Sequence, residues 1–404
     1  MFMQKIILDN GITLIINSTD SVSIAIQATI KVGSNHETDK TRGISHFIEH
    51  LLFEGTKNRT GHEIASAIEG VGGDIGAFTS NTRTAYHIKV LKKHFPIAVD
   101  VLGDMLMHPL FDKKAIEKER KIILSEISMR KDEPRSHQWE LFQKGLFKNF
   151  PAQHPIIGYE QIIKKLSQKE FKDHYTKYYV GSNIIITLSG KVDSKDIALV
   201  SREFSKILSK SIENKPLELG YMNSKSKTVK EKRDIQHSYL VYGCQSVPRG
   251  HEDSYVFDVI EAILGRPLSG RLFRYIRQEK GLCYDIGAHY EDEIGYGFFA
   301  VYLSTTKNKL KEAEKLLQEQ INKVDSISNE ELKEVKQFLE GDYLLSMEDN
   351  EKRVDDLAFW EYAGSVLLSQ KYVGEIKKVT IKDIFRVKKK YLKNFTKAII
   401  EQGK

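Results

Sequence analysis

The chain has 404 residues, of which 40% are hydrophobic and 29% charged, and its formal net charge is +7. This length exceeds one ordinary core and predicts two or more domains, while the hydrophobic content excludes a disordered chain. The basic residues are interleaved with acidic ones and form no stripe with aromatic side chains, which argues against a nucleic-acid-binding surface.

The N-terminus and the cysteine content bear on location. The segment MFMQKIILDNG lacks the basic cluster, apolar run and cleavage site of a signal peptide. No run of 18 or more apolar residues is present, so we expect no membrane span. Two cysteines, Cys244 and Cys283, imply no disulfide framework. These features favour a reducing cytoplasm.

The first half begins with strand patterns. Asn10-Gly11 between the apolar runs KIILD and ITLIIN predicts a β-hairpin, and SVSIAIQATIKVG predicts a third strand. Helical spacing follows in GISHFIEHLLFEG, and Thr60 begins a second helix, GHEIASAIEG. DIGAFTS and TAYHIKVL predict two more strands. A helical tract then runs from about His94 to about Lys131, with a break at His108-Pro109.

A polar segment separates the two halves. Residues 209–234 are rich in Ser, Lys, Glu and Asn, which favours a linker. We therefore predict one domain at 1–212, a linker at 213–232 and a second domain at 233–404. The second half has a strand (SYLVYGCQS), a helix (SYVFDVIEAILG), two strands around Tyr284 and Phe298, and long helices to the end.

The two halves resemble each other. Segments 164–190 and 377–403 align without gaps, and each has a helix rich in Lys and Tyr followed by an apolar strand. HFIEHLLFEG lies at almost the same phase as DVIEAILG, although the second copy lacks the histidine pair. These similarities predict a duplicated α+β domain.

The pentapeptide His46-Phe47-Ile48-Glu49-His50 carries the first candidate site. Each helical residue advances by about 100°, so the two histidines lie one turn apart and Glu49 projects from the same face. Two such imidazoles can bind one zinc ion, with the glutamate placed to hold a water. A buried helix with two hydrogen-bonded histidines has the same pattern, and five residues do not decide between the two.

A third ligand is needed, because a catalytic zinc takes three protein ligands. Glu119 and Glu126 lie about 20° apart on a predicted helix, with apolar Ile122 and Ile123 between them. Such a pair suits a ligand and a supporting carboxylate. Taken alone, two glutamates in this spacing are more often an exposed acidic face.

Together these motifs resemble the pitrilysin (inverzincin) family of metallopeptidases. Within it, the chain is most similar to the short-subunit branch that contains mitochondrial processing peptidase and its bacterial and archaeal relatives. HFIEH fits the inverted motif, and ERKIILSEI places Glu126 76 residues after His50, where the family has its third ligand. HPIIG and YYVGSNIIITLSGKVD also resemble family segments. The resemblance implies one zinc ion per chain bound by His46, His50 and Glu126, with Glu49 as general base and Glu119 as a supporting carboxylate.

The resemblance also extends to substrate contacts. SGRLFRYIRQEKGLCYDIGAHY is similar to a family segment whose arginine and tyrosine contact the substrate backbone, here Arg277 and Tyr284. The family pairs its substrate with an exposed edge strand, which corresponds here to Ala77, Phe78 and Thr79. Without the resemblance, an ordinary strand, a surface ion pair and a tyrosine packed in the sheet are the more frequent arrangements. The family usually has Asn where this chain has Gly76, but backbone pairing needs no side chain there.

The family's organisation gives the remaining expectations. It implies two related domains, each a mostly antiparallel sheet packed with helices, and an endopeptidase that encloses extended peptides between two such halves. Because one chain supplies one half, we expect a homodimer, with a heterodimer as the alternative. A non-catalytic structural subunit and a peptide-binding module are the competing functions, and the intact zinc motif favours the enzyme. We expect no nucleic-acid or membrane partner.

Overall fold

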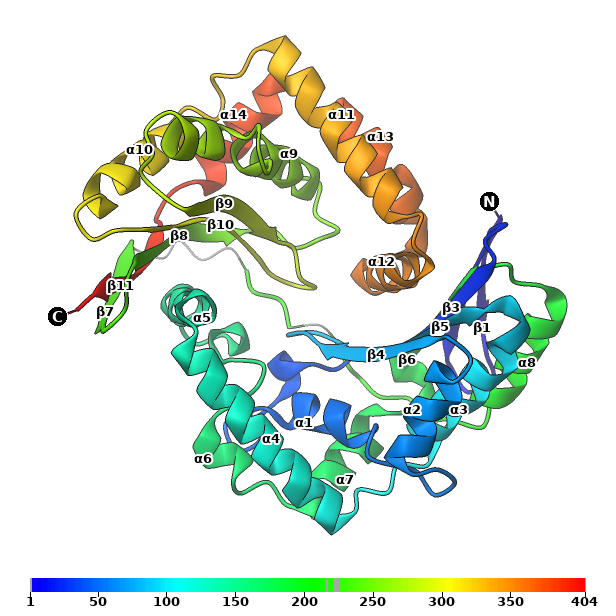
Figure 1. The fold of residues 1–404 in the computed structure, drawn as a ribbon. Coiled ribbons are helices and arrows are strands. Elements are labelled where there is room, and N and C mark those ends of the chain that lie inside the picture. Colours follow the sequence, from blue (N-terminus) through cyan, green and yellow to red (C-terminus); the bar gives the residue numbers. More distant parts are fainter. Residues whose placement is uncertain (1, 216, 221–225, 404) are drawn as a thin grey trace. The chain divides into compact units, whose positions relative to one another are not determined.

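The computed structural model describes residues 2–215, 217–220 and 226–403 (Figure 1). The chain forms two compact units, and each is discontinuous in sequence. Unit 1 comprises Met1–Ser128, His154–Lys215 and Leu345–Ser369, and unit 2 comprises Met129–Gln153, Pro216–Leu344 and Gln370–Lys404. No helix among the described residues is long and apolar enough to cross a membrane.

Unit 1 is built on a six-stranded sheet with the order β1-β2-β6-β3-β5-β4. Strands β2 and β6 pair in parallel, and the other neighbours pair antiparallel. The strands are β1 (Phe2–Ile7), β2 (Thr13–Ser18), β3 (Ser23–Ile30), β4 (Asp74–Thr79), β5 (Thr84–Leu91) and β6 (Ile184–Gly190).

Helices cover both faces of this sheet. Leu14 and Ile16 point into the main core, whereas Ile15 points to the opposite face and packs in a cluster with Leu357 of α12. The helices of unit 1 are α1 (Ile44–Leu51), α2 (Gly61–Glu69), α3 (Phe95–Met107), most of α4 (Lys113–Asp132), α6 (Glu160–Ile163), α7 (Gln168–Tyr178), α8 (Ser194–Phe204) and α12 (Asn350–Ala363).

Unit 2 is built on a five-stranded sheet with the order β7-β11-β8-β10-β9, in which β7 and β11 are parallel. Its strands are β7 (Lys227–Arg233), β8 (Ser238–Ser246), β9 (Asp285–Glu291), β10 (Gly297–Thr305) and β11 (Thr396–Gln402). Its helices are α5 (Pro134–Leu146), α9 (Ser254–Gly265), α10 (Leu310–Asn322), nearly all of α11 (Asn329–Ser346), α13 (Tyr372–Lys378) and α14 (Ile381–Tyr391). Phe142 and Leu146 of α5 pack in one cluster with Val241, Phe298 and Ala398 of the sheet.

The strand orders confirm the predicted duplication. β2-β6-β3-β5-β4 of unit 1 corresponds to β7-β11-β8-β10-β9 of unit 2, and the parallel pair stands at the same place in both. In each copy a helix follows the third strand of this order and precedes the edge strand. Helix α1 comes between β3 and β4, and α9 comes between β8 and β9. The fold is therefore α+β, with two related, mostly antiparallel sheets packed with helices, as predicted.

The sequence patterns located most elements correctly. The hairpin at Asn10-Gly11 joins β1 and β2, and Thr60 is the N-cap of α2, where its hydroxyl accepts from the backbone N–H of Glu63 at 3.2 Å. One part of the predicted linker 213–232 is wrong, because Lys227–Arg233 forms strand β7. The residues of this segment are mostly polar and therefore did not predict a strand. An edge strand is stabilised by its backbone hydrogen bonds and tolerates polar residues.

Candidate metal centre

The N-terminus of helix α1 is constrained by a glycine and by a buried carboxylate. Gly43, its N-cap, has φ 94°, and a Cβ there would lie 2.6 Å from the carbonyl oxygen of Ile157. The carboxylate of Glu37 accepts the backbone N–H groups of Gly43 and Ser45 at 2.7 and 2.9 Å. Burial raises the pKa of Glu37 to about 7, against the opposing effect of these donors. The start of α1 is thus held by buried partners, which fixes the direction of the helix.

The two faces of α1 differ in character. Ile44, Phe47, Ile48 and Leu51 are buried in the main core of unit 1. The opposite face carries His46, Glu49 and His50, which are half-buried. This division confirms the predicted helix with its three polar side chains on one face.

Helix α4 is anchored against α1 by both apolar and polar contacts. Ile123 and Ile127 lie in the core, and Asp112 caps the helix by accepting the N–H of Lys114 at 2.7 Å. The guanidinium of Arg120 donates to the carbonyl oxygen of Leu166 at 2.8 Å and lies 5.6 Å from the ring centre of Phe47 on α1. These contacts place the carboxylates of α4 opposite the histidines of α1.

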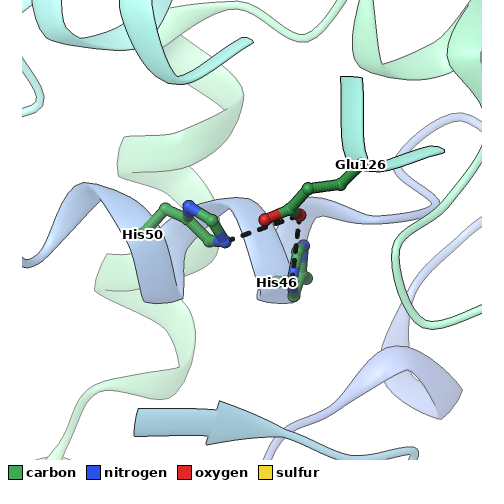
Figure 2. Close-up of side chains that lie close together, drawn as sticks. All are labelled: His46, His50 and Glu126. Atoms are coloured by element: carbon green, nitrogen blue, oxygen red, sulfur yellow. Dashed lines mark ion pairs between the residues drawn. The ribbon is translucent and has the colours of Figure 1, made fainter. Parts of the chain in front are cut away.

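The structure brings His46, His50 and Glu126 together (Figure 2). Oε2 of Glu126 lies 4.0 Å from Nε2 of His46 and 3.9 Å from Nε2 of His50. One ligand atom from each of the three residues lies within 4.8 Å of the others. The side chains of His46 and His50 are 16% and 21% exposed and that of Glu126 is 37% exposed, so the cluster is sheltered and still reachable from solvent.

The donor set fits a zinc ion. Two imidazole nitrogens and a carboxylate oxygen are the ligands of a catalytic zinc site, and tetrahedral ligands about 2.0–2.1 Å from the metal lie roughly 3.3 Å apart. The separations of 3.9 and 4.0 Å slightly exceed this value and are too long for direct hydrogen bonds. The three donor atoms therefore face one another at separations close to those around a zinc ion.

Glu119 contacts His50 through Nδ1, the ring nitrogen that does not face Glu126. Its Oε2 lies 3.0 Å from Nδ1 of His50, and its Oε1 lies 3.6 Å from Nζ of Lys118. Burial lowers the pKa of His50, but the hydrogen bond to Glu119 and the nearby carboxylates more than offset this, so the net shift is upward. Burial opposes ionisation of Glu119, yet its contacts with His50 and Lys118 lower its pKa. Glu119 therefore fixes the imidazole of His50 with Nε2 turned towards Glu126.

Glu119→Gln is expected to weaken zinc binding by about 10- to 100-fold, because the variant loses the charged acceptor that orients His50. Competition against a fluorescent zinc chelator measures the change. Glu69→Gln, the same substitution at an exposed helical position, serves as the matched control. An unchanged zinc affinity in Glu119→Gln would contradict the supporting role.

Glu49 is bonded to the neighbouring edge strand. Oγ1 of Thr79 donates to Oε2 of Glu49 at 2.5 Å. Burial raises the pKa of Glu49, and the hydrogen bond from Thr79 acts in the opposite direction. A half-buried carboxylate with a raised pKa beside the metal cluster is suited to accept and return a proton.

Strand β4, which carries Ala77, Phe78 and Thr79, lies at the end of the sheet and pairs with β5. The Phe78 ring lies 5.3 Å from the guanidinium of Arg83. A Cβ at Gly76 would lie 2.7 Å from Nε2 of His87, which explains why a bulkier residue does not fit there without a shift of that ring. Peptide pairing along β4 stays a prediction.

Arg277 and Tyr284 belong to unit 2. Arg277 lies in the π-helix Phe273–Gln278, with its guanidinium 5.0 Å from the ring centre of Phe273. Tyr284 directly precedes β9, is 68% exposed, and its ring lies 5.2 Å from that of His237. Their contact with substrate also stays a prediction.

Three contacts around the cluster were not predicted from the sequence. Glu37 caps α1 from a preceding turn, Arg120 anchors α4, and the Thr79 hydroxyl bonds Glu49. Arg120 adjoins Glu119 in the ERKIILSEI segment, so its position was the one available signal. The other two contacts depend on tertiary packing and have no local pattern.

The chain is similar to known peptidases. Residues 12–160 match the family model Insulinase (Peptidase family M16), and residues 165–339 match the Peptidase M16 inactive domain. The chain is 31% identical over 350 residues to the uncharacterized zinc protease YmxG of Bacillus subtilis, covering 85% of this chain and 84% of the relative. It is 30% identical over 344 residues to an uncharacterized zinc protease of Rickettsia felis, covering 84% and 83%.

A solved structure shows the same fold. A protease from Helicobacter pylori superimposes with a TM-score of 0.93 over 99% of each chain at 20% sequence identity. A sheltered His/His/Glu cluster beside a half-buried glutamate defines a metallopeptidase class of site. The chain belongs to the insulinase or pitrilysin family, peptidase family M16, in the short form with an N-terminal domain and an inactive C-terminal domain.

Proposed function

We propose that this chain is a zinc-dependent endopeptidase that cleaves extended peptides or unfolded segments. The observation that carries the proposal is the convergence of His46, His50 and Glu126, with Glu49 on the same face of α1. The curated bacterial relatives are named zinc proteases, which supports zinc as the metal. We propose one zinc ion per chain, since the cluster offers one set of three ligands.

The residues around the cluster divide the chemistry between them. Zinc held there supplies a Lewis acid that lowers the pKa of water and polarises a carbonyl group. Glu49 takes a proton from the attacking water and passes it to the nitrogen of the departing amine. Glu119 keeps the imidazole of His50 oriented throughout.

The peptide is held by its backbone in this proposal. β4 ends its sheet, so its free edge offers backbone N–H and C=O groups to an added strand at Ala77, Phe78 and Thr79. The guanidinium of Arg277 and the phenol of Tyr284 donate to the peptide backbone and to the oxyanion that forms at the scissile carbonyl. Selection then depends on an extended chain more than on particular side chains.

We propose that two copies pair, each completing the other's site with Arg277 and Tyr284. The exposed Tyr284 supports this arrangement, because a phenol that donates to substrate must be accessible. Mixing inactive Glu49→Gln with inactive Tyr284→Phe is expected to restore up to about a quarter of parental activity after subunit exchange. No restored activity in a mixture shown to exchange subunits would contradict the shared site.

The two free cysteines are consistent with a cytoplasmic location, which we also propose.

The test combines metal content with peptide turnover. The protein is stripped with a chelator and titrated with zinc, while cleavage of an internally quenched peptide is followed and products are identified by mass spectrometry. Internal cleavage that rises with zinc and saturates at about one ion per chain supports the proposal. Zinc binding without cleavage would favour the peptide-binding module, and absence of zinc binding would favour a structural subunit.

A further inference from the structure

The hydrogen bond between Thr79 and Glu49 joins the edge strand to the helix of the metal cluster. Thr79 is the last residue of β4 and pairs with Thr84 of β5, while Glu49 lies between the two histidines of α1 in sequence. The separation of 2.5 Å between Oγ1 of Thr79 and Oε2 of Glu49 makes this a short contact to a half-buried carboxylate. It therefore restrains the orientation of the carboxylate.

The bond has a direction that distinguishes the two carboxylate oxygens. A carboxylate offers acceptor sites only, and a threonine hydroxyl has one proton to donate. The proton of Thr79 is directed to Oε2 and occupies one acceptor site of that oxygen, so Oε1 keeps both of its sites for a proton from water. A β-branched side chain on a paired strand has few rotamers, which makes Thr79 a stiffer support than a residue on a loop.

We propose that Thr79 is a positioning residue for peptide hydrolysis, whose hydroxyl holds Oε2 of Glu49 so that Oε1 faces the attacking water. This inference rests on the proposed function of Glu49 as general base. The proton of the water moves to Oε1 and then to the leaving amine, while the proton of Thr79 remains on its own oxygen. Because Thr79 also ends the strand proposed to hold the peptide, the same strand positions both the substrate and the general base.

The experiment compares Thr79→Val, which keeps the shape and removes the donor, with Thr79→Ser, which keeps the donor. Thr79→Val is expected to lower kcat about 10- to 100-fold, as for a lost hydrogen bond to a charged group, with KM changed less than about threefold. Thr79→Ser is expected to stay within about threefold of the parent in kcat. Thr228→Val is the matched control, because it makes the same change at an exposed position on β7, which ends the other sheet.

Zinc content and the thermal midpoint are measured alongside, and both are expected to equal those of the parent in Thr79→Val. In a Glu49→Gln background, Thr79→Val is expected to lower kcat by less than about twofold, because residues that act through one group are not additive. An unchanged kcat, an effect confined to KM, a full additional loss in the Glu49→Gln background, or loss of zinc or of stability in step with activity would each overturn the inference.

Failure of the proposed function has a different signature. It shows in the parent protein as absence of zinc-dependent cleavage, or in Glu49→Gln as near-normal turnover, and either result would overturn both proposals. Normal parental cleavage with an inactive Glu49→Gln and a fully active Thr79→Val would overturn the positioning role alone.

Discussion

Glu49→Gln is expected to lower kcat by about 10²- to 10⁴-fold, the usual contribution of a general base, while zinc content stays that of the parent. The amide has nearly the shape of the carboxylate and can still accept the hydrogen bond of Thr79 through its oxygen, but it cannot take a proton from water. The proposed zinc ligands His46, His50 and Glu126 are untouched.

The measurement is steady-state cleavage of a quenched peptide, with zinc quantified on the same samples. Glu69→Gln, the same change at the exposed end of α2, is expected to leave both quantities unchanged. Near-normal turnover in Glu49→Gln would remove the general-base role, and loss of zinc would show instead that Glu49 is needed to build the site.

Glu126→Gln is expected to weaken zinc binding by more than the roughly 10- to 100-fold change of a supporting residue, and to abolish turnover at limiting zinc. Glu126 provides the one carboxylate oxygen of the cluster and the one proposed ligand from α4, and a neutral amide oxygen is a poor substitute for it. Its side chain is 37% exposed, so the zinc-free variant is expected to keep the thermal midpoint of the zinc-free parent.

Zinc affinity by chelator competition and activity at fixed free zinc provide the measurements. Glu119→Gln gives the internal comparison, since Glu119 lies on the same helix and contacts His50 without belonging to the proposed ligand set. Equal zinc affinities of Glu126→Gln and the parent would contradict the assignment of Glu126 as a ligand.

Local patterns in the sequence predicted the elements that depend on local physics. The helical face of His46, Glu49 and His50 follows from the residue spacing, and DIGAFTS and TAYHIKVL correspond to β4 and β5. The proximity of α4 to α1 is a tertiary fact, and the resemblance to a family supplied it. Residue spacing alone left Glu126 indistinguishable from a glutamate on an exposed acidic face.

The sequence patterns did not predict which sheet helices α5 and α12 pack on. Helix α5 follows α4 in the chain and packs on the sheet of unit 2, whereas α12 follows unit 2 strands and packs on the sheet of unit 1. An apolar helix face shows that a helix is covered, but it does not show which sheet covers it. The Thr79–Glu49 hydrogen bond escaped prediction for the same reason, since it joins residues from two elements.

The central claim is that side chains from α1 and α4 bind one metal ion, and a zinc-loaded crystal measured at the zinc absorption edge tests it most directly. We predict one anomalous peak in unit 1, about 2.0–2.2 Å from Nε2 of His46, Nε2 of His50 and a carboxylate oxygen of Glu126. A peak elsewhere, or zinc bound without Glu126, would contradict it.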